Sequence, residues 1–223
     1  MSDGKKEKNT DYKFILLGDS AVGKTSFFKK LNTEIFSEKN ISTIGIDKRT
    51  LYFKNIEIKI NGNTQNVDFN VVLFDTAGQE RYRAITKTFI QGSEGVIIMY
   101  DITCKKSFLG VEAWLDSITQ TLSHWKTGRY VITLIGNKAD LVENGEKERE
   151  VKEEEATKMC SDKEIYWAGE CSVKDFSVQE LNDILVTTWK NYVEKCGLKA
   201  EISTQNEMKG IKYVKKPKRR SFC

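Results

Sequence analysis

The sequence predicts an α/β protein in which a mainly parallel sheet carries helices on both faces. Short apolar runs of strand length recur along the chain, and patterns of helical period lie between several of them, an alternation typical of parallel sheets. The chain has 223 residues, of which 39% are hydrophobic and 30% are charged, with a single proline. These values fit one water-soluble globular domain followed by a tail.

Five apolar runs are predicted to form buried strands, at residues 14–17, 71–74, 96–100, 130–135 and 165–168. Apolar residues spaced three and four apart place one stripe on a helix between Phe108 and Trp125. A second stripe of the same spacing runs from Leu181 to Tyr192, and Gly197 is placed to end that helix.

One stretch departs from this alternation. Residues 51–60 and 67–74 fit two long strands joined by a polar segment that begins Asn61-Gly62, which is a hairpin signal. After Gly197 the apolar period is lost and the chain becomes polar and basic. We therefore expect a polar N-terminal extension at 1–11, one domain at 12–197 and a flexible tail at 198–223.

The formal net charge of +4 belongs to this tail. Without its seven basic residues the chain has 29 basic (36 − 7) and 32 acidic residues, a balance of −3. The domain itself is thus not predicted to carry a nucleic-acid-binding face. The seven residues lie within the last 15 positions and are Lys209, Lys212, Lys215, Lys216, Lys218, Arg219 and Arg220.

The cysteines and the apolar runs indicate a cytoplasmic protein. Five cysteines, an odd number without CxxC spacing, favour reduced thiols over a disulfide framework or a zinc site. The longest apolar stretches fall far short of the ~20 residues that span a bilayer, and the start of the chain is polar. We expect neither a signal peptide nor a transmembrane helix.

A glycine-rich segment follows the first predicted strand and precedes a helical pattern through Phe28 and Leu31. It fits GxxxxGK[ST], a pattern in which backbone N–H groups and a helix N-terminus converge on phosphates. The lysine neutralises β- and γ-phosphate oxygens, and the threonine hydroxyl ligates Mg²⁺. The sequence thus predicts a phosphate loop of Gly18, Asp19, Ser20, Ala21, Val22, Gly23, Lys24, Thr25 and Ser26.

Two further motifs end predicted strands. Asp75-Thr76-Ala77-Gly78-Gln79 places a carboxylate at the carboxyl end of a strand, where ligands bind in open α/β sheets, so Asp75 is predicted to hold Mg²⁺ through water. Asn137-Lys138-Ala139-Asp140 follows the strand at 130–135. A carboxylate there can accept from the N1–H and N2–H₂ groups of guanine, and adenine would leave it unpaired. The chain is therefore predicted to bind GTP and GDP.

With these motifs in order, the chain resembles the Ras superfamily of small GTPases over residues 12–194. The resemblance implies the Ras-like P-loop NTPase fold, a mostly parallel six-stranded sheet with helices on both faces. It also implies that Thr43 contacts Mg²⁺ and the γ-phosphate and that Phe36 packs against the base. Residues 170–174 are similar to the family's ETSAK loop, whose backbone N–H groups contact the base oxygen, so Ser172, Val173 and Lys174 are predicted to bind the base.

Within the superfamily the sequence is most similar to the Rab branch, through residues 18–26, 42–47, 80–86 and 100–103. Lys48 and Phe74 stand where Rabs usually carry phenylalanine and tryptophan. Together with Phe89 these positions resemble the aromatic triad that Rab effectors contact, so we expect a divergent set of effectors.

Two more departures concern length and the C-terminus. Thr43 and Asp75 are 32 positions apart (75 − 43), more than the family norm, and we expect the excess in the hairpin around Asn61. Cys223 is a single terminal cysteine, neither the double-cysteine ending of many Rabs nor a CaaX box.

The resemblance implies a monomeric GTP/GDP switch that hydrolyses GTP and regulates vesicle-mediated traffic. Gln79, Lys24 and Thr43 are the implied catalytic residues, and Thr25, Thr43 and Asp75 the implied Mg²⁺ ligands. The implied partners are an exchange factor, a GTPase-activating protein, and effectors that bind the loops around Thr43 and Gly78. Prenylation of Cys223 beside the basic tail would hold the protein on the cytosolic face of an endomembrane or the plasma membrane.

Three alternatives stay open at this point. One is a module that binds GTP without hydrolysing it, which the presence of Gln79 disfavours. A second is a signalling GTPase of another branch of the superfamily. The third is a nuclear transport or nucleic-acid role, because residues 215–220 resemble a nuclear localisation signal, although such basic runs also serve membranes.

Overall fold

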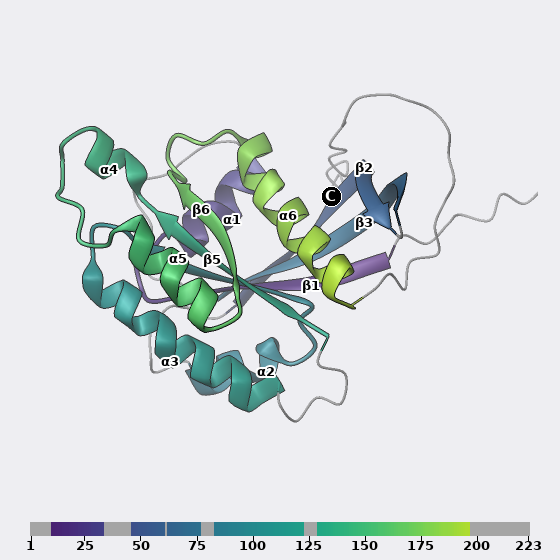
Figure 1. Cartoon of the computed structure of the whole chain (residues 1–223), viewed down its shortest axis with the longest axis horizontal. Coiled ribbons are helices and arrows are strands. Elements are labelled where there is room, and N and C mark those ends of the chain that lie inside the picture. The colour runs from purple at the N-terminus through teal and green to yellow at the C-terminus, as the bar shows by residue number, and fades with distance from the viewer. Residues whose placement is uncertain (1–9, 34–45, 61, 77–82, 123–128, 197–223) are drawn as a thin grey trace, which may run out of the picture.

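The computed structural model describes residues 10–33, 46–60, 62–76, 83–122 and 129–196, and the side chains of 83–86 are left out of the description. The chain alternates strands with helices, apart from one antiparallel hairpin (Figure 1). The elements are β1 (Thr10–Leu17), α1 (Lys24–Thr33), β2 (Ile46–Ile60), β3 (Asn63–Thr76), α2 (Arg83–Ile90), β4 (Gly95–Asp101), α3 (Lys105–Leu122), β5 (Val131–Asn137), α4 (Ala139–Glu143), α5 (Glu153–Asp162), β6 (Tyr166–Cys171) and α6 (Val178–Cys196).

The described strands form one six-stranded sheet in the order β2-β3-β1-β4-β5-β6. All neighbours pair in parallel except β2 and β3, which form the antiparallel hairpin. The predicted fold class, a mostly parallel six-stranded sheet of the Ras-like type, is therefore confirmed.

Helices cover both faces of the sheet, as Figure 1 shows. Alternate residues of the central strands point to opposite sides, so Phe14 and Leu16 of β1 pack with α1 and α6, whereas Ile15 and Leu17 pack with α3 and α5. The rings of Phe69 in β3 and Trp189 in α6 stack with centroids 3.8 Å apart. Because both faces are covered, the central strands read as continuous apolar runs, which is why they could be predicted.

The hairpin of β2 and β3 is longer than predicted. Its strands begin at Ile46 and end at Thr76, and they pair as far as Ile60 and Asn63. A register shift interrupts the pairing between Phe53 and Ile56, where Asn55 adopts a left-handed conformation and its N–H donates to the Asp68 carboxylate at 2.8 Å. Beyond this bulge the strands go on pairing, and Ile56 is buried in the core that α6 covers.

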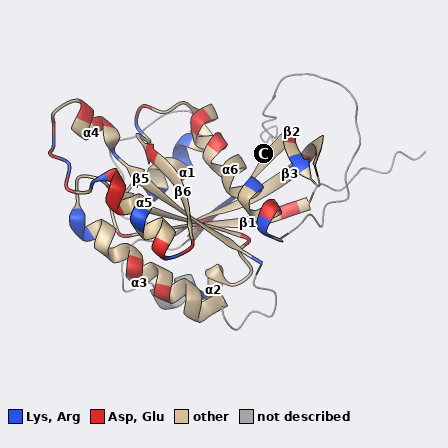
Figure 2. Cartoon of the chain, viewed as in Figure 1, with Lys and Arg blue, Asp and Glu red and all other residues tan. Residues whose placement is uncertain are grey.

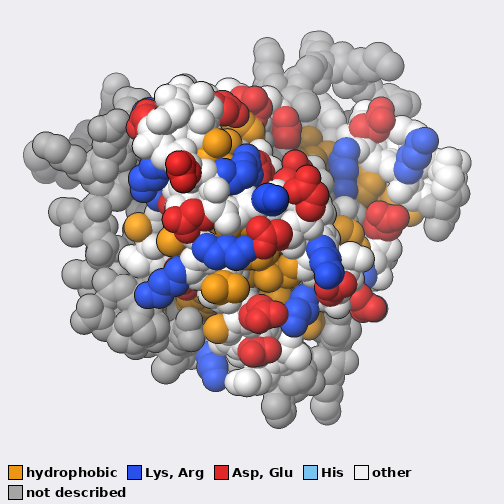
Figure 3. All heavy atoms as spheres, turned by 60° about the vertical axis from the view of Figure 1, so that its left-hand side comes forward, with side chains coloured by type: hydrophobic (Ala, Val, Ile, Leu, Met, Phe, Trp, Pro, Cys, Tyr) orange, Lys and Arg blue, Asp and Glu red, His pale blue; other side chains and the backbone are white. Residues whose placement is uncertain are grey.

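Charged side chains lie mainly on the periphery. Figure 2 shows the central strands almost free of them, and on the face drawn in Figure 3 basic and acidic groups are interspersed. Such mixing is typical of a solvated surface. No helix in the described part of the chain is long and apolar enough to cross a membrane.

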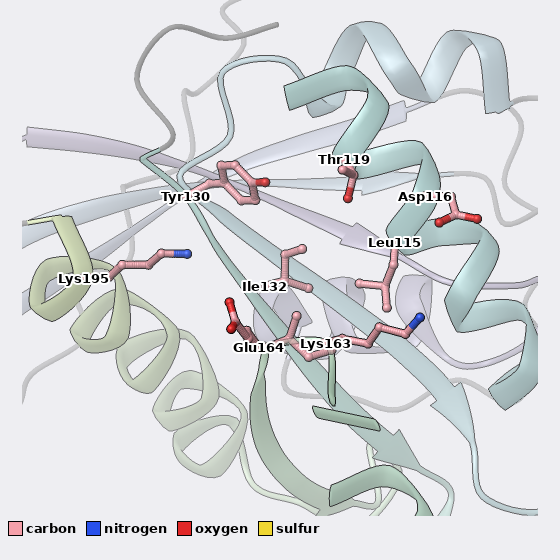
Figure 4. Close-up of a pocket in the computed structure, with 9 residues that line it drawn as sticks. Leu115, Asp116, Thr119, Tyr130, Ile132, Lys163, Glu164 and Lys195 are labelled. Carbon is pink, nitrogen blue, oxygen red and sulfur yellow. The ribbon is translucent and has the colours of Figure 1, made fainter. Parts of the chain in front are cut away.

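A cavity of about 260 Å³ lies near the amino end of β5 (Figure 4). Leu115 of α3 and Ile132 of β5 line its apolar part, while Lys163, Glu164 and Lys195 surround it with charges of both signs. Its place at the start of β5 separates it from the predicted site, whose residues follow the strands' carboxyl ends.

Candidate functional site

The carboxyl ends of five parallel strands lie at one edge of the sheet and bring the predicted motifs together there. Leu16 of β1 pairs with Asp75 of β3, and Asn137 of β5 pairs with both Asp101 of β4 and Cys171 of β6. The Thr76 hydroxyl also donates to the Leu16 carbonyl at 2.7 Å. Motifs far apart in sequence therefore meet where ligands bind in open α/β sheets.

The phosphate loop forms a tight curl between β1 and α1. Gly18, Ala21 and Gly23 have positive φ angles, of 133°, 64° and 110°. A side chain on Gly18 would place its Cβ 2.2 Å from the Met99 carbonyl oxygen, and one on Gly23 would place it 2.1 Å from Asn137 Nδ2. Both glycines are thus required by conformation and by space. The loop ends at the N-terminus of α1, where backbone N–H groups favour an anion.

Lys24 lies buried within this curl. Its ammonium group donates to the carbonyl oxygens of Gly18 at 2.8 Å and of Asp19 at 2.7 Å. Burial lowers the pKa of Lys24 to about 8, and the Asp75 and Asp19 carboxylates oppose that shift. At neutral pH the side chain is therefore mostly a cation held inside the loop.

Asp75 is fully buried beside this cation. Neither carboxylate oxygen has a partner of ordinary hydrogen-bond geometry among the residues the structure describes. Burial raises the pKa of Asp75 to about 6, although the nearby Thr25 hydroxyl and the Lys24 ammonium lower it. A carboxylate buried beside a hydroxyl, with no hydrogen bond of ordinary geometry among the described residues, fits the oxygen ligands that Mg²⁺ prefers.

Asn137 joins three segments of the site. Its side-chain amide donates to the Val22 carbonyl in the phosphate loop at 2.8 Å. Its Oδ1 accepts from the Val173 N–H at 3.0 Å and from the Cys171 thiol at 3.5 Å. Burial raises the pKa of Cys171 to about 12, so the thiol stays protonated and can donate. Cys171 therefore supplies a thiol donor at the position where the ETSAK pattern has a threonine hydroxyl.

The neighbouring Lys138 adopts a left-handed conformation, with φ of 72°, and pairs with Asp101. Its Nζ lies 2.7 Å from one Asp101 oxygen, and the Thr103 N–H and hydroxyl donate to the other. Burial alone would raise the pKa of Asp101, but these hydrogen bonds outweigh it and hold the pKa below its usual value. The pair fixes the segment that leads into α4.

Asp140 lies in the first turn of α4 and is 4% exposed. The loop after β6 lies nearby, because Asn137 holds Val173. Ser172 and Asp175 brace that loop by hydrogen bonds in both directions. The structure thus brings Asp140 and residues 172–174 together at the end of β5, where base binding was predicted.

Two residues of α3, Trp114 and Gly110, lie against the phosphate loop without any signal in the motifs. The buried Trp114 indole N–H donates to Asp19 Oδ1 at 3.0 Å. A Cβ on Gly110 would lie only 2.6 Å from Asp19 Oδ2, so a larger residue there would displace this carboxylate. Asp19 is therefore turned towards α3. Trp114 has the helical spacing of a core residue, so the sequence pattern gave no sign of its contact with Asp19.

Five of the predicted site residues lie outside the described residues, namely Phe36, Thr43, Gly78, Gln79 and Cys223. The three positions that resemble the effector triad are described. Lys48 pairs directly with Phe74 across the hairpin and is exposed, and the Phe74 and Phe89 ring centroids are 6.0 Å apart. Lys13 Nζ lies 5.1 Å from the centre of the Phe74 ring. These residues form one surface with two lysines beside the aromatic pair.

Comparison with known proteins agrees with this geometry. The sequence profile of the Ras family matches residues 13–191. Ras-related protein Rab-27A of Rattus norvegicus is 35% identical over 201 residues, covering 88% of this chain and 85% of that protein. Ras-related protein RabC of Dictyostelium discoideum is 34% identical over 180 residues, covering 81% of this chain and 84% of that protein. EF-hand calcium-binding domain-containing protein 4B of Homo sapiens is 43% identical over 143 residues, but the chain spans only 17% of that protein.

We predict that Trp114→Phe lowers the free energy of unfolding by about 1–2 kcal/mol beyond its packing cost, because a hydrogen bond to a carboxylate is lost. Urea denaturation of Trp114→Phe, of Asp19→Ala and of the double variant gives the coupling energy between the two side chains, which is the contribution of their hydrogen bond. Trp167→Phe is the matched control, since the Trp167 indole donates to Glu153 at an exposed position. If Trp114→Phe lowers the free energy of unfolding equally with and without the Asp19 carboxylate, the two side chains are not coupled and the assigned hydrogen bond contributes nothing.

Proposed function

The chain belongs to the Ras family, and we propose that it binds guanine nucleotide with Mg²⁺, hydrolyses GTP slowly and acts as a two-state switch. One observation carries this proposal: Asn137 ties the phosphate loop and the loop after β6 together beside the buried Asp140. In this proposal, the phosphate-binding and guanine-binding parts of the site would thereby be held at a fixed separation.

The phosphate side suits a nucleotide bound with Mg²⁺. Lys24 is a buried cation whose present acceptors are backbone carbonyls, which phosphate oxygens would replace with charged partners. We assign Thr25, Thr43 and Asp75 to the metal, Asp75 through water. When bound, Mg²⁺ would neutralise charge on the phosphate oxygens. The burial of the Asp75 carboxylate beside the Thr25 hydroxyl and the Lys24 ammonium supports this assignment.

On the base side, Asp140 would accept from the N1–H and N2–H₂ groups of guanine. Adenine lacks that pair of donors, and leaving a carboxylate buried and unpaired is costly. Lys138 and Phe36 are assigned to the flanks of the base, and the backbone N–H groups of 172–174 to its oxygen. The Val173 N–H already donates to Asn137, so its neighbours in the loop are the candidate donors.

Hydrolysis needs an aligned water and stabilised charge more than covalent chemistry. We assign Gln79 to the water, Lys24 to the phosphate oxygens and Thr43 to the metal and the γ-phosphate. The motifs supply no arginine in cis, so intrinsic turnover should be on the order of 10⁻⁴ to 10⁻³ s⁻¹, and an activating protein would add up to ~10⁵-fold.

We further propose a Rab-like role in vesicle traffic, with exchange factors, activating proteins and effectors that bind the loops around Thr43 and Gly78. The Rab-27A and RabC similarities support this branch. The exposed Lys48 beside the Phe74–Phe89 pair favours effectors that place an acidic group beside an aromatic contact. A prenylated Cys223 would add a lipid chain to the basic tail, and the two together would hold the protein reversibly on an anionic membrane.

We predict that Gln79→Leu leaves GDP binding intact and lowers single-turnover GTP hydrolysis at least tenfold, because the attacking water loses its orienting amide. The assay follows conversion of preloaded GTP to GDP with excess Mg²⁺. Gln91→Leu, at an exposed position after α2, is the control for the chemical change. Equal hydrolysis rates in Gln79→Leu and the parent would remove Gln79 from the mechanism.

For the tail, we expect mass spectrometry of the C-terminal peptide from cells to show an isoprenoid on Cys223. Fractionation should then move Cys223→Ser from the membrane pellet to the supernatant, since the charges alone bind weakly at physiological salt. An unmodified peptide, together with a variant that sediments as the parent does, would exclude lipid anchoring.

A further inference from the structure

Lys30 of α1 is a buried cation that the proposed chemistry does not use. It is 7% exposed, whereas the adjacent Lys29 is exposed. Burying an ammonium group costs free energy unless hydrogen bonds compensate for it. Such a group in a helix that also carries Lys24 and Thr25 points to a role in the site.

The Lys30 ammonium donates to the carbonyl oxygens of Val173 at 3.0 Å and of Lys174 at 2.7 Å. Both acceptors belong to the loop after β6, more than 140 positions away in sequence, and α1 and α6 lie on the same face of the sheet (Figure 1). Glu180 is the acid whose charge interacts with Lys30, but it is exposed and its carboxylate accepts from Ser177. The two carbonyls are therefore the main partners of this cation.

These contacts fix the direction of a backbone donor. In a trans peptide the C=O and the following N–H point in opposite directions. A Val173 carbonyl held towards Lys30 therefore directs the Lys174 N–H away from α1. The preceding N–H, of Val173, is held by Asn137. Together, Lys30 and Asn137 set the orientation of consecutive peptide units in the loop.

In guanine the O6 acceptor is adjacent to N1, so a base whose N1–H is held by Asp140 presents O6 to donors beside that carboxylate. We propose that Lys30 is a positioning residue that directs the Lys174 N–H to guanine O6 and thereby slows nucleotide release. This inference rests on the proposed guanine-nucleotide site. Its physical basis is the pair of hydrogen bonds by which Lys30 of α1 holds the loop after β6.

The test compares GDP with 6-thio-GDP on the full chain. The thio analogue keeps N1–H and N2–H₂ for Asp140 but replaces O6 by sulfur, a weaker acceptor. In Lys30→Met, the affinity for GDP should fall on the order of tenfold, the value of one misdirected hydrogen bond, and GDP release should accelerate accordingly. Affinity for 6-thio-GDP should fall much less, so the preference for GDP over its thio analogue shrinks.

The ratio of the two dissociation constants separates positioning from simple destabilisation, because a lower fraction of folded protein affects both nucleotides equally. Lys30→Arg, which can donate to two carbonyls, should restore the parental ratio. Lys190→Met is the control, since Lys190 is exposed on α6. An unchanged ratio in Lys30→Met would overturn the inference alone, whereas a parent chain that binds ADP as tightly as GDP would overturn the proposed function.

Discussion

The hydrogen bonds of a single buried amide hold the site together. Asn137 donates to Val22 and accepts from Val173 and Cys171, so the phosphate loop, the end of β5 and the loop after β6 share one residue as their common anchor. Its position at the end of a buried strand gives the anchor a rigid base, and Gly23 is the residue that lets the phosphate loop approach it. The distance between the phosphate and base sides therefore follows from the packing of this amide.

Electrostatics complements that constraint. Burial holds the pKa of Lys24 at about 8 and that of Asp75 at about 6. The lowered pKa of Lys24 destabilises the fold increasingly as pH falls below the ordinary lysine value of 10.5, and this cost is complete below about pH 8. The raised pKa of Asp75 destabilises the fold increasingly as pH rises above the ordinary aspartate value of 3.8, and this cost is complete above about pH 6. Both costs are therefore complete between about pH 6 and pH 8. A phosphate beside Lys24 and a divalent cation beside Asp75 would offset them. The same charges that weaken the bare fold thus favour the bound state.

Much of this arrangement could be predicted from sequence, because strands buried on both faces are apolar throughout and their terminal motifs lie at one sheet edge. Short elements were missed: α5 buries only Ala156 and Cys160, too few for an apolar stripe. Residues 10–13 join β1 only because β3 pairs with them. Lys30 was missed because the sequence does not distinguish it from exposed Lys29, and its acceptors are backbone carbonyls distant in the chain.

Base selection by Asp140 is the central claim, and replacing one oxygen of its carboxylate by an amide NH₂ group tests it directly. Asp140→Asn replaces an acceptor oxygen by an amide that donates, which suits the O2 of xanthine and not the N2–H₂ of guanine. Competition binding of GDP and XDP to the parent and the variant measures the preference. The account predicts that the parent prefers GDP and that the variant prefers XDP, a reversal of selectivity. A variant that still prefers GDP as strongly as the parent would contradict it.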